Sequence, residues 1–234
     1  MMRYLILTLI AIICFTDVMH SQKLVQFTDS IIQNVNRNNY EKATYFNQLA
    51  EKEIINKSLK KKDTLFADYL YAKSVLYYFT SKKSTNTLKE SLDIWNKSNV
   101  KNQYKIMKIH YFLGLSYYDT GTKSNEESFL KKSYYHFENV CLINENYKIA
   151  RSPHFLKSLN YLNNINKKYF KTENNSNYKK YVENYIALNT ESSIENFDFN
   201  TIILFRRIND LLGQEKMLKQ FLDKLIVHIN DKKL

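Results

Sequence analysis

Apolar residues recur at intervals of three and four along most of the chain, the spacing that places side chains on one face of an α-helix. The stretch Leu24–Val35 shows this pattern near the amino terminus. Only three glycines and one proline are present, whereas β-rich folds need both at many tight turns. The pattern therefore predicts an all-α protein. Near the carboxyl terminus, one helical face is formed by Met217, Leu218, Phe221, Leu222, Leu225 and Ile226.

The helical pattern repeats along the chain. Tyr71–Tyr78 aligns with Tyr111–Tyr118, forty residues on, and in both segments a small residue precedes a Tyr-Tyr pair. The segments that follow, Leu88–Trp95 and Leu130–Phe137, also match each other. Each copy therefore consists of two helical segments, as expected of a repeat protein. Weaker copies extend the array on both sides, with Leu24–Val35 before Asn39–Phe46 and Leu156–Tyr161 before Tyr178–Tyr185.

Helix-start signals divide these copies into helical pairs. Ser152-Pro153 places a capping serine before a proline at the first helical position and predicts a helix running to about Phe170. Phe199–Leu212 ends at Gly213 and begins a last pair. The chain thus predicts about five antiparallel helical hairpins. Three further pairs have the spacing of a capping box and predict starts of second helices: Asn38 with Glu41, Thr87 with Glu90, and Ser124 with Glu127.

Several of these positions resemble the tetratricopeptide repeat (TPR). Gly114 and Tyr117 in a first helix, with Ser133 and Phe137 in a second, follow its order of small and large residues; Tyr40, Ala43, Ala50 and Val140 extend the likeness. The resemblance implies an α-solenoid in which small residues lie where two helices touch closely. The closing proline is missing and the period is longer than the family's, so a generic helical repeat or an irregular bundle is the alternative. The expected organisation is a signal peptide over 1–21, TPR-like hairpins over 22–190 and a capping hairpin over 191–234.

The amino terminus predicts export. Arg3 precedes the uncharged, apolar run Tyr4–Phe15, which is shorter than a membrane span, and Ser21 offers a small residue for cleavage before Gln22. We expect the mature chain in the periplasm or outside the cell. A retained membrane anchor and a lipoprotein acylated on Cys14 are the alternatives. After residue 22 no apolar run is long enough to cross a bilayer, so no transmembrane segment is expected in the mature chain.

Nothing in the sequence indicates catalysis, a metal or a cofactor. The histidines at 110, 136, 154 and 228 are widely separated, and no second pair of ligands accompanies His136 and Cys141. Both of these residues are interpreted as lying on the apolar side of a helix. Glu51 and Glu53 are interpreted as solvent-facing or helix-capping, and no glycine-rich phosphate loop is present. The protein is therefore expected not to be an enzyme; an enzyme of unrecognised type is the distant alternative.

The sequence does predict a binding surface. First helices of stacked hairpins line the concave side of a solenoid, and here they are rich in tyrosine, a residue favoured in recognition. The adjacent pairs Tyr77-Tyr78 and Tyr117-Tyr118 are the candidate partner-binding residues, with one member of each packed inward. The net charge of +12 favours a protein or peptide partner of acidic character. Anionic lipid or polysaccharide is the alternative partner; nucleic acid is not expected for an exported protein.

Overall fold

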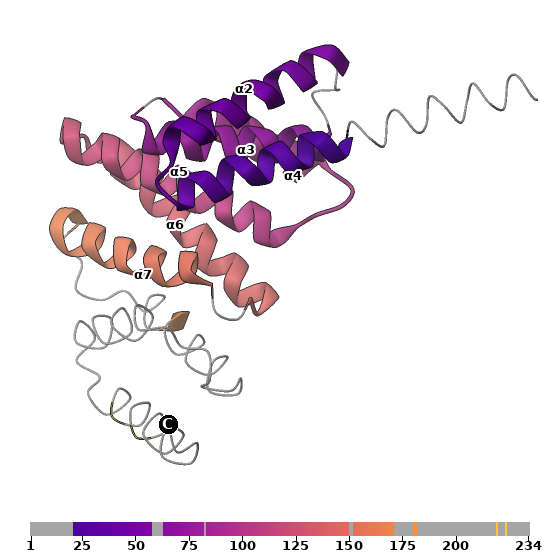
Figure 1. The fold of residues 1–234 in the computed structure, drawn as a ribbon. Helices are drawn as coiled ribbons and strands as arrows, with labels where there is room; N and C mark the ends of the chain where they lie inside the picture. Colours follow the sequence, from indigo (N-terminus) through magenta and orange to yellow (C-terminus); the bar gives the residue numbers. More distant parts are fainter. Residues whose placement is uncertain are drawn as a thin grey trace, which may run out of the picture. The chain divides into compact units, whose positions relative to one another are not determined.

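The computed structural model describes residues 21–57, 63–81, 83–149, 152–170, 180, 181, 219 and 223. Every regular element among these residues is a helix, which confirms the predicted all-α class (Figure 1). The chain divides into two compact units, unit 1 ending at Asn102 and unit 2 beginning at Gln103.

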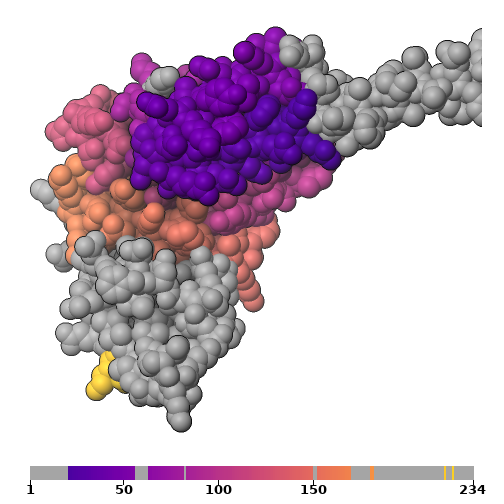
Figure 2. Space-filling model, viewed as in Figure 1, coloured from indigo at the N-terminus to yellow at the C-terminus, as the bar shows by residue number. Residues whose placement is uncertain are grey.

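Unit 1 contains a helix over residues 21–36, α2 (Tyr40–Lys57), α3 (Thr64–Phe79) and α4 (Thr85–Lys97). The helix over 21–36 and α2 are joined by residues 37–39 alone, so the two form a hairpin (Figure 1). Ala43 and Ala50 of α2 are fully buried, as the TPR-like pattern predicts for small residues at helix contacts. The side chains of residues 21–57 form one closely packed surface (Figure 2).

Unit 2 contains α5 (Gln103–Ser124), α6 (Glu127–Tyr147), α7 (Pro153–Ile165) and the π-helical turn η1 (Asn166–Phe170). α6 packs against both α5 and α7 (Figure 1). Every residue of α5 from 109 to 117 is buried, so this stretch has no solvent-facing side. Only the two ends of α5 are therefore left to contact a partner.

Gly114 lies at a close contact between α5 and α6, as the TPR resemblance implies. A Cβ atom added at Gly114 would lie 2.6 Å from Cε1 of Phe137, a distance that real side chains do not adopt. On the same face, the Ser133 hydroxyl donates a 2.8 Å hydrogen bond to the Gly114 carbonyl. The small residue on α5 thus admits both an aromatic ring and a serine hydroxyl from α6.

The structural repeat differs in register from the sequence alignment. In the α3–α4 hairpin, the Ser91 hydroxyl donates a 2.7 Å hydrogen bond to the Ala67 carbonyl. Ser91 aligns with Ser133, so the equivalent of Gly114 in α3 is Ala67, whereas the sequence alignment matched Gly114 with Ser74. Ala67 and Ser74 are seven residues apart, nearly two full turns. Both therefore lie on the same face of α3. The alignment identified the correct face of the helix but placed the equivalent position about two turns too far along it.

The predicted cap of α7 is confirmed and that of α2 is one residue off. The Ser152 hydroxyl accepts a hydrogen bond from the Phe155 amide, and Pro153 opens the helix. At α2, the side chain of Asn39 accepts from the Lys42 amide. Asn38, the predicted cap, instead has a positive φ of 57°. Two adjacent asparagines offer the same cap chemistry, which the sequence cannot rank.

The predicted caps of α4 and α6 are wrong. α4 begins after Ser84, so Thr87 lies inside the helix. α6 begins after Glu126, while Ser124 is the last residue of α5 and donates to the carbonyl of Thr120. At neither start does the side chain of the residue before the helix cap it with a hydrogen bond, so a capping-box spacing alone did not locate these starts.

Several sequence predictions fall outside the described residues. They are the signal peptide over 1–21 apart from residue 21, nearly all of the fourth hairpin's second helix, and the capping hairpin over 191–234 apart from residues 219 and 223. Of that second helix, residues 180 and 181 are described as helical, and Tyr181 is buried. Across the described ranges, no helix is both long and apolar enough to span a membrane.

Candidate protein-binding face

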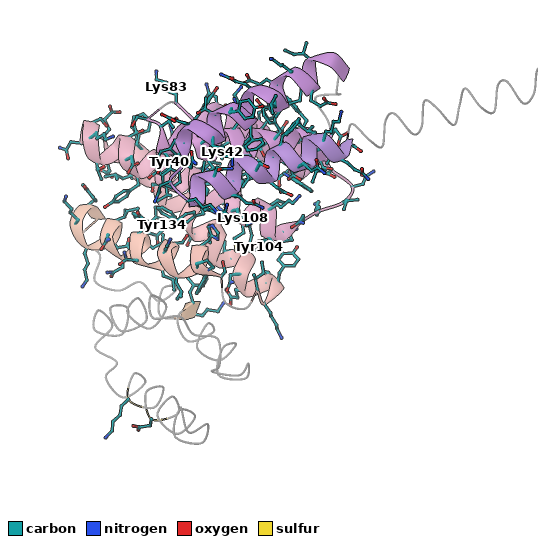
Figure 3. All side chains as sticks on the ribbon, in the orientation of Figure 1. Tyr40, Lys42, Lys83, Tyr104, Lys108 and Tyr134 are labelled. Carbon is teal, nitrogen blue, oxygen red and sulfur yellow. The ribbon has the colours of Figure 1, made fainter. Side chains whose placement is uncertain are left out.

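One side of α5 is lined by tyrosine and lysine. Tyr104, Lys108, Tyr111 and Tyr118 are separated by four, three and seven residues, so they lie on one side of the helix. Tyr104 is 41% exposed, and the Lys108 Nζ lies 4.3 Å from the centroid of its ring (Figure 3). Tyr111 is buried, whereas Tyr118 is half-buried. The row thus begins with an exposed cation–π pair and ends in a tyrosine that reaches solvent.

α7 places a matching row beside it. His154, Lys157 and Tyr161 are separated by three and four residues and again share one side. Tyr111 meets His154 edge to face with ring centroids 4.9 Å apart, and Tyr118 meets Tyr161 in the same way at 4.9 Å. The two rows therefore pack against each other, and Tyr111 is the buried member between the two ends of the α5 row that reach solvent. We name the two rows together the α5–α7 strip: Tyr104, Lys108, Tyr111, Tyr118, His154, Lys157 and Tyr161.

The end of the strip near Tyr104 is electropositive. Burial, followed by the charges of Lys108 and Lys157, lowers the pKa of His154 to about 4. Both lysines are thus close enough for their charges to act on the imidazole ring. The same two positive charges would attract an incoming anion.

The other end of the strip is mixed in charge. η1 adds Lys168, whose Nζ lies 5.1 Å from the centroid of the Tyr169 ring. Burial raises the pKa of Tyr118; the charge of Lys168 opposes this, while Tyr169 and Asp119 add to it. Burial likewise raises the pKa of Tyr161. The hydroxyls of Tyr118 and Tyr161 therefore stay protonated at neutral pH and can donate hydrogen bonds.

The predicted recognition tyrosines divide between the core and the surface. Tyr117 is buried and stacks on His136, with ring centroids 5.5 Å apart and planes 7° from parallel. Its neighbour Tyr118 is half-buried, so this pair has one inward and one outward member. On α3, Tyr78 and its neighbour Tyr77 are both half-buried. The role of all four tyrosines in binding stays a prediction.

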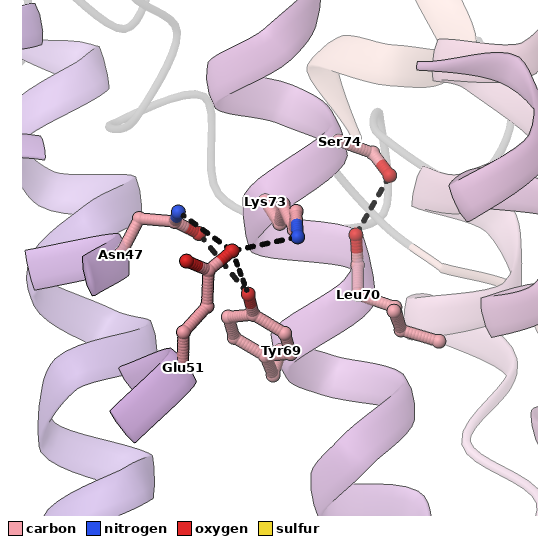
Figure 4. A network of polar contacts seen from close by, with 6 residues as sticks. All are labelled: Asn47, Glu51, Tyr69, Leu70, Lys73 and Ser74. Carbon is pink, nitrogen blue, oxygen red and sulfur yellow. Dashed lines mark hydrogen bonds and ion pairs between the residues drawn. The ribbon is translucent and has the colours of Figure 1, made fainter. Parts of the chain in front are cut away.

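Tyr77 adjoins a polar network that the sequence interpretation missed. Glu51 on α2 accepts hydrogen bonds from Lys73 at 2.7 Å and from the Tyr69 hydroxyl at 3.1 Å, both on α3 (Figure 4). Asn47 donates to the same carboxylate oxygen at 3.3 Å. The Lys73 Nζ also lies 5.4 Å from the ring centroid of Tyr77. Glu51 therefore joins α2 to α3, although 39% of its side-chain surface stays exposed.

The network sets the charges of its members. Burial by itself would raise the pKa of Glu51, but the hydrogen bond and charge of Lys73 outweigh it, and the pKa is lowered. Burial also opposes the charged form of Lys73, yet Glu51 keeps the pKa of that amine raised. Two spacings could have suggested the contact, namely Asn47 with Glu51 and Tyr69 with Lys73, each one helical turn apart. Nothing in the sequence relates the two pairs to each other.

A buried histidine pair lies between α5 and α6. The Nδ1 atoms of His110 and His136 are 3.0 Å apart, so one nitrogen carries the proton and the other accepts it. Burial lowers the pKa of His110 to about 4. Cys141 is fully buried, and burial raises the pKa of its thiol. Within the described ranges, no three metal-binding side chains come together.

Comparisons with known proteins bear on the fold. No protein-family model matches the sequence, and no curated protein matches it either. Two solved structures are similar: nearly identical TPR-like repeats of a chain assigned as a kinesin light chain in Podosopora anserina, one of them a single-residue variant. The TM-scores are 0.61 and 0.60 at 11% identity. The matches cover 92% and 91% of this chain and 98% and 97% of the others. At this identity the likeness concerns architecture alone, and by its architecture the chain is a TPR-like array of helical hairpins.

Proposed function

We propose that this protein is an exported, non-catalytic scaffold that binds a protein or peptide segment of acidic character. The observation that carries the proposal is the α5–α7 strip, in which tyrosines and lysines share one side of the first helices of two successive hairpins. TPR-like arrays are protein-interaction scaffolds, and their first helices line the concave surface. The predicted signal peptide supports export.

The composition of the strip suits a peptide. The half-buried Tyr118 and Tyr161 offer contact area and hydroxyl donors at a low entropic cost, because each side chain has few rotatable bonds. Lys108 and Lys157 provide charge that accelerates association with an acidic segment. Aromatic contact would thus give specificity, and the lysines would give rate and salt dependence.

Tyr118→Ala tests the proposal against a matched control. Tyr147 on α6 is 55% exposed and lies outside the strip, so Tyr147→Ala removes an equivalent side chain elsewhere. Binding to a panel of labelled acidic peptides is measured by fluorescence anisotropy at low and high salt. We expect Tyr118→Ala to weaken binding by about 1 kcal/mol or more, while Tyr147→Ala leaves it unchanged.

The net charge of +12 supports a second candidate, a basic protein that adheres to anionic lipid or polysaccharide. Anionic vesicles in the same assay separate the two. Binding that survives both tyrosine changes, prefers vesicles to peptides and is lost at high salt would favour this candidate.

A further inference from the structure

Two lysines lie near a histidine at the electropositive end of the α5–α7 strip: Lys157 is one turn after His154 on α7, and Lys108 is one turn before Tyr111, the ring that His154 contacts. Lys108 comes from α5, and His154 and Lys157 come from α7. Tyr111 closes one side of the imidazole through its edge-to-face contact. Tyr111 is in ring contact with His154, and Lys108 and Lys157 are the charged groups of unit 2 that act on it. Lys157 is exposed, and within the described ranges no carboxylate forms an ion pair with it.

The two nitrogens of His154 have different surroundings. Nδ1 is enclosed and has no hydrogen-bond partner among the described residues, whereas Nε2 is not enclosed in this way. A buried N–H group without an acceptor is rare in proteins because its hydration is lost without replacement. The neutral ring therefore carries its proton on Nε2, where it can donate to a ligand.

A second proton would have to occupy the enclosed Nδ1 next to two ammonium groups. This agrees with the lowered pKa of His154, which burial dominates and the two lysines reinforce. At neutral and mildly acidic pH the ring thus acts as an uncharged N–H donor between two cations. A hydrogen-bond donor flanked by two positive charges is the chemistry that recognises an anionic oxygen.

We propose that Lys108, His154 and Lys157 form a subsite for one carboxylate of an acidic peptide segment, with His154 Nε2–H donating to it as a neutral group. The subsite rests on the proposed function and specifies where the acidic residue of the partner lies. The exposed Tyr104 borders the position on α5, and the buried Tyr111 supports the imidazole ring through their edge-to-face contact. A membrane surface would need lysines on an open face; here aromatic rings border them.

This arrangement also predicts how the affinity for an acidic peptide depends on pH. An ordinary histidine gains its charge as the pH falls through about 6.5, so an anion-binding surface that used it would bind more tightly below that pH. His154, by contrast, stays neutral as the pH falls through this value. Affinity for a glutamate-rich peptide should therefore be flat between about pH 5.5 and 8, the range in which the peptide carboxylates are ionised.

The experiment measures binding of a short fluorescent glutamate peptide to the full chain. Lys157→Gln should weaken binding about fivefold or more, because it removes a charge-assisted contact. Lys131→Gln on α6 makes the same change in net charge at an exposed site outside the strip and should change affinity less than about twofold. Circular dichroism of each variant separates a lost contact from a lost fold.

Two substitutions at His154 test its role directly. His154→Leu should weaken binding, and His154→Gln, which keeps a neutral N–H donor, should recover most of the loss. Three results would overturn the subsite: equal losses in Lys157→Gln and Lys131→Gln, a wild-type affinity that rises as the pH falls through about 6.5 only while His154 is present, or stronger competition by inorganic phosphate than by acetate. If Tyr118→Ala still weakens binding in any of these cases, the subsite fails and the proposed function stands. A chain that binds no peptide, or binds it independently of Tyr118, overturns both.

Discussion

Replacement of Gly114 by alanine tests whether the close contact between α5 and α6 limits the stability of the fold. The new methyl group would lie 2.6 to 2.9 Å from three ring atoms of Phe137. The ring cannot move away cheaply, because it is fully buried and stacks on Tyr161 with centroids 4.8 Å apart. Overpacking of this kind costs about 1–3 kcal/mol. Alanine also favours the helix over glycine by about 1 kcal/mol, so the net effect should be a loss of up to about 2 kcal/mol.

The measurement is urea unfolding followed by far-ultraviolet circular dichroism, with a thermal melt as a second probe. A loss of about 1 kcal/mol corresponds to a fall in Tm of about 2–4 °C for a chain of this size. Gly114→Leu should lower stability further, since it adds more atoms at the same contact. In a Phe137→Leu background most of the conflict disappears, and Gly114→Ala should then stabilise by about 1 kcal/mol. Equal stabilisation by Gly114→Ala in both backgrounds would refute the close contact.

Four further predictions concern other parts of the chain. The lowered pKa of Glu51 means that its contribution to stability is present above the unfolded-state pKa and is lost as the pH falls through the folded-state value. Lys73→Met should reduce this acid dependence, as measured by urea unfolding across about pH 3 to 6, while the hydrogen bonds from Tyr69 and Asn47 remain. Cys141 should not react with a thiol reagent in the native protein and should react fully in denaturant, because its sulfur is buried. Amino-terminal sequencing of natively expressed protein should begin near Gln22, and an intact Met1 on cytoplasmic protein would contradict export. Circular dichroism should show a mainly helical chain, and strand content above about a tenth would contradict the fold.

The order of helices was readable from the sequence because it depends on local patterns. The apolar spacing, the Ser152 cap and the position of Gly114 at a close contact between two helices are all confirmed. Exact helix starts were not readable, since runs such as Asn38-Asn39 contain more than one residue able to cap. Tertiary packing makes that choice.

The candidate site was predicted only in part for a related reason. Tyr118 was found because it belongs to a repeated pair, but His154, Lys157 and Tyr161 were not connected with it. They lie in the next hairpin, and their contact with α5 depends on how two hairpins stack. The bonds that Glu51 accepts from α3 depend in the same way on the meeting of α2 and α3. A repeated sequence pattern identifies the hairpin that is repeated, whereas this candidate binding surface forms where two successive hairpins meet.

The π-helical turn after α7 has a consequence for how such a surface could change. Its hydrogen bonds reach one residue farther than those of an α-helix, so the turn contains one residue more than an α-helical turn would. Removal of a single residue between 166 and 170 would restore α-helical winding and change the direction in which Lys168 and Tyr169 leave the helix axis. The buried side of α7, including Phe155 and Leu159, lies before the turn and would keep its contacts. The deletion of one residue is thus enough to redirect a lysine and a tyrosine beyond the end of α7 while the buried side of α7 keeps its contacts.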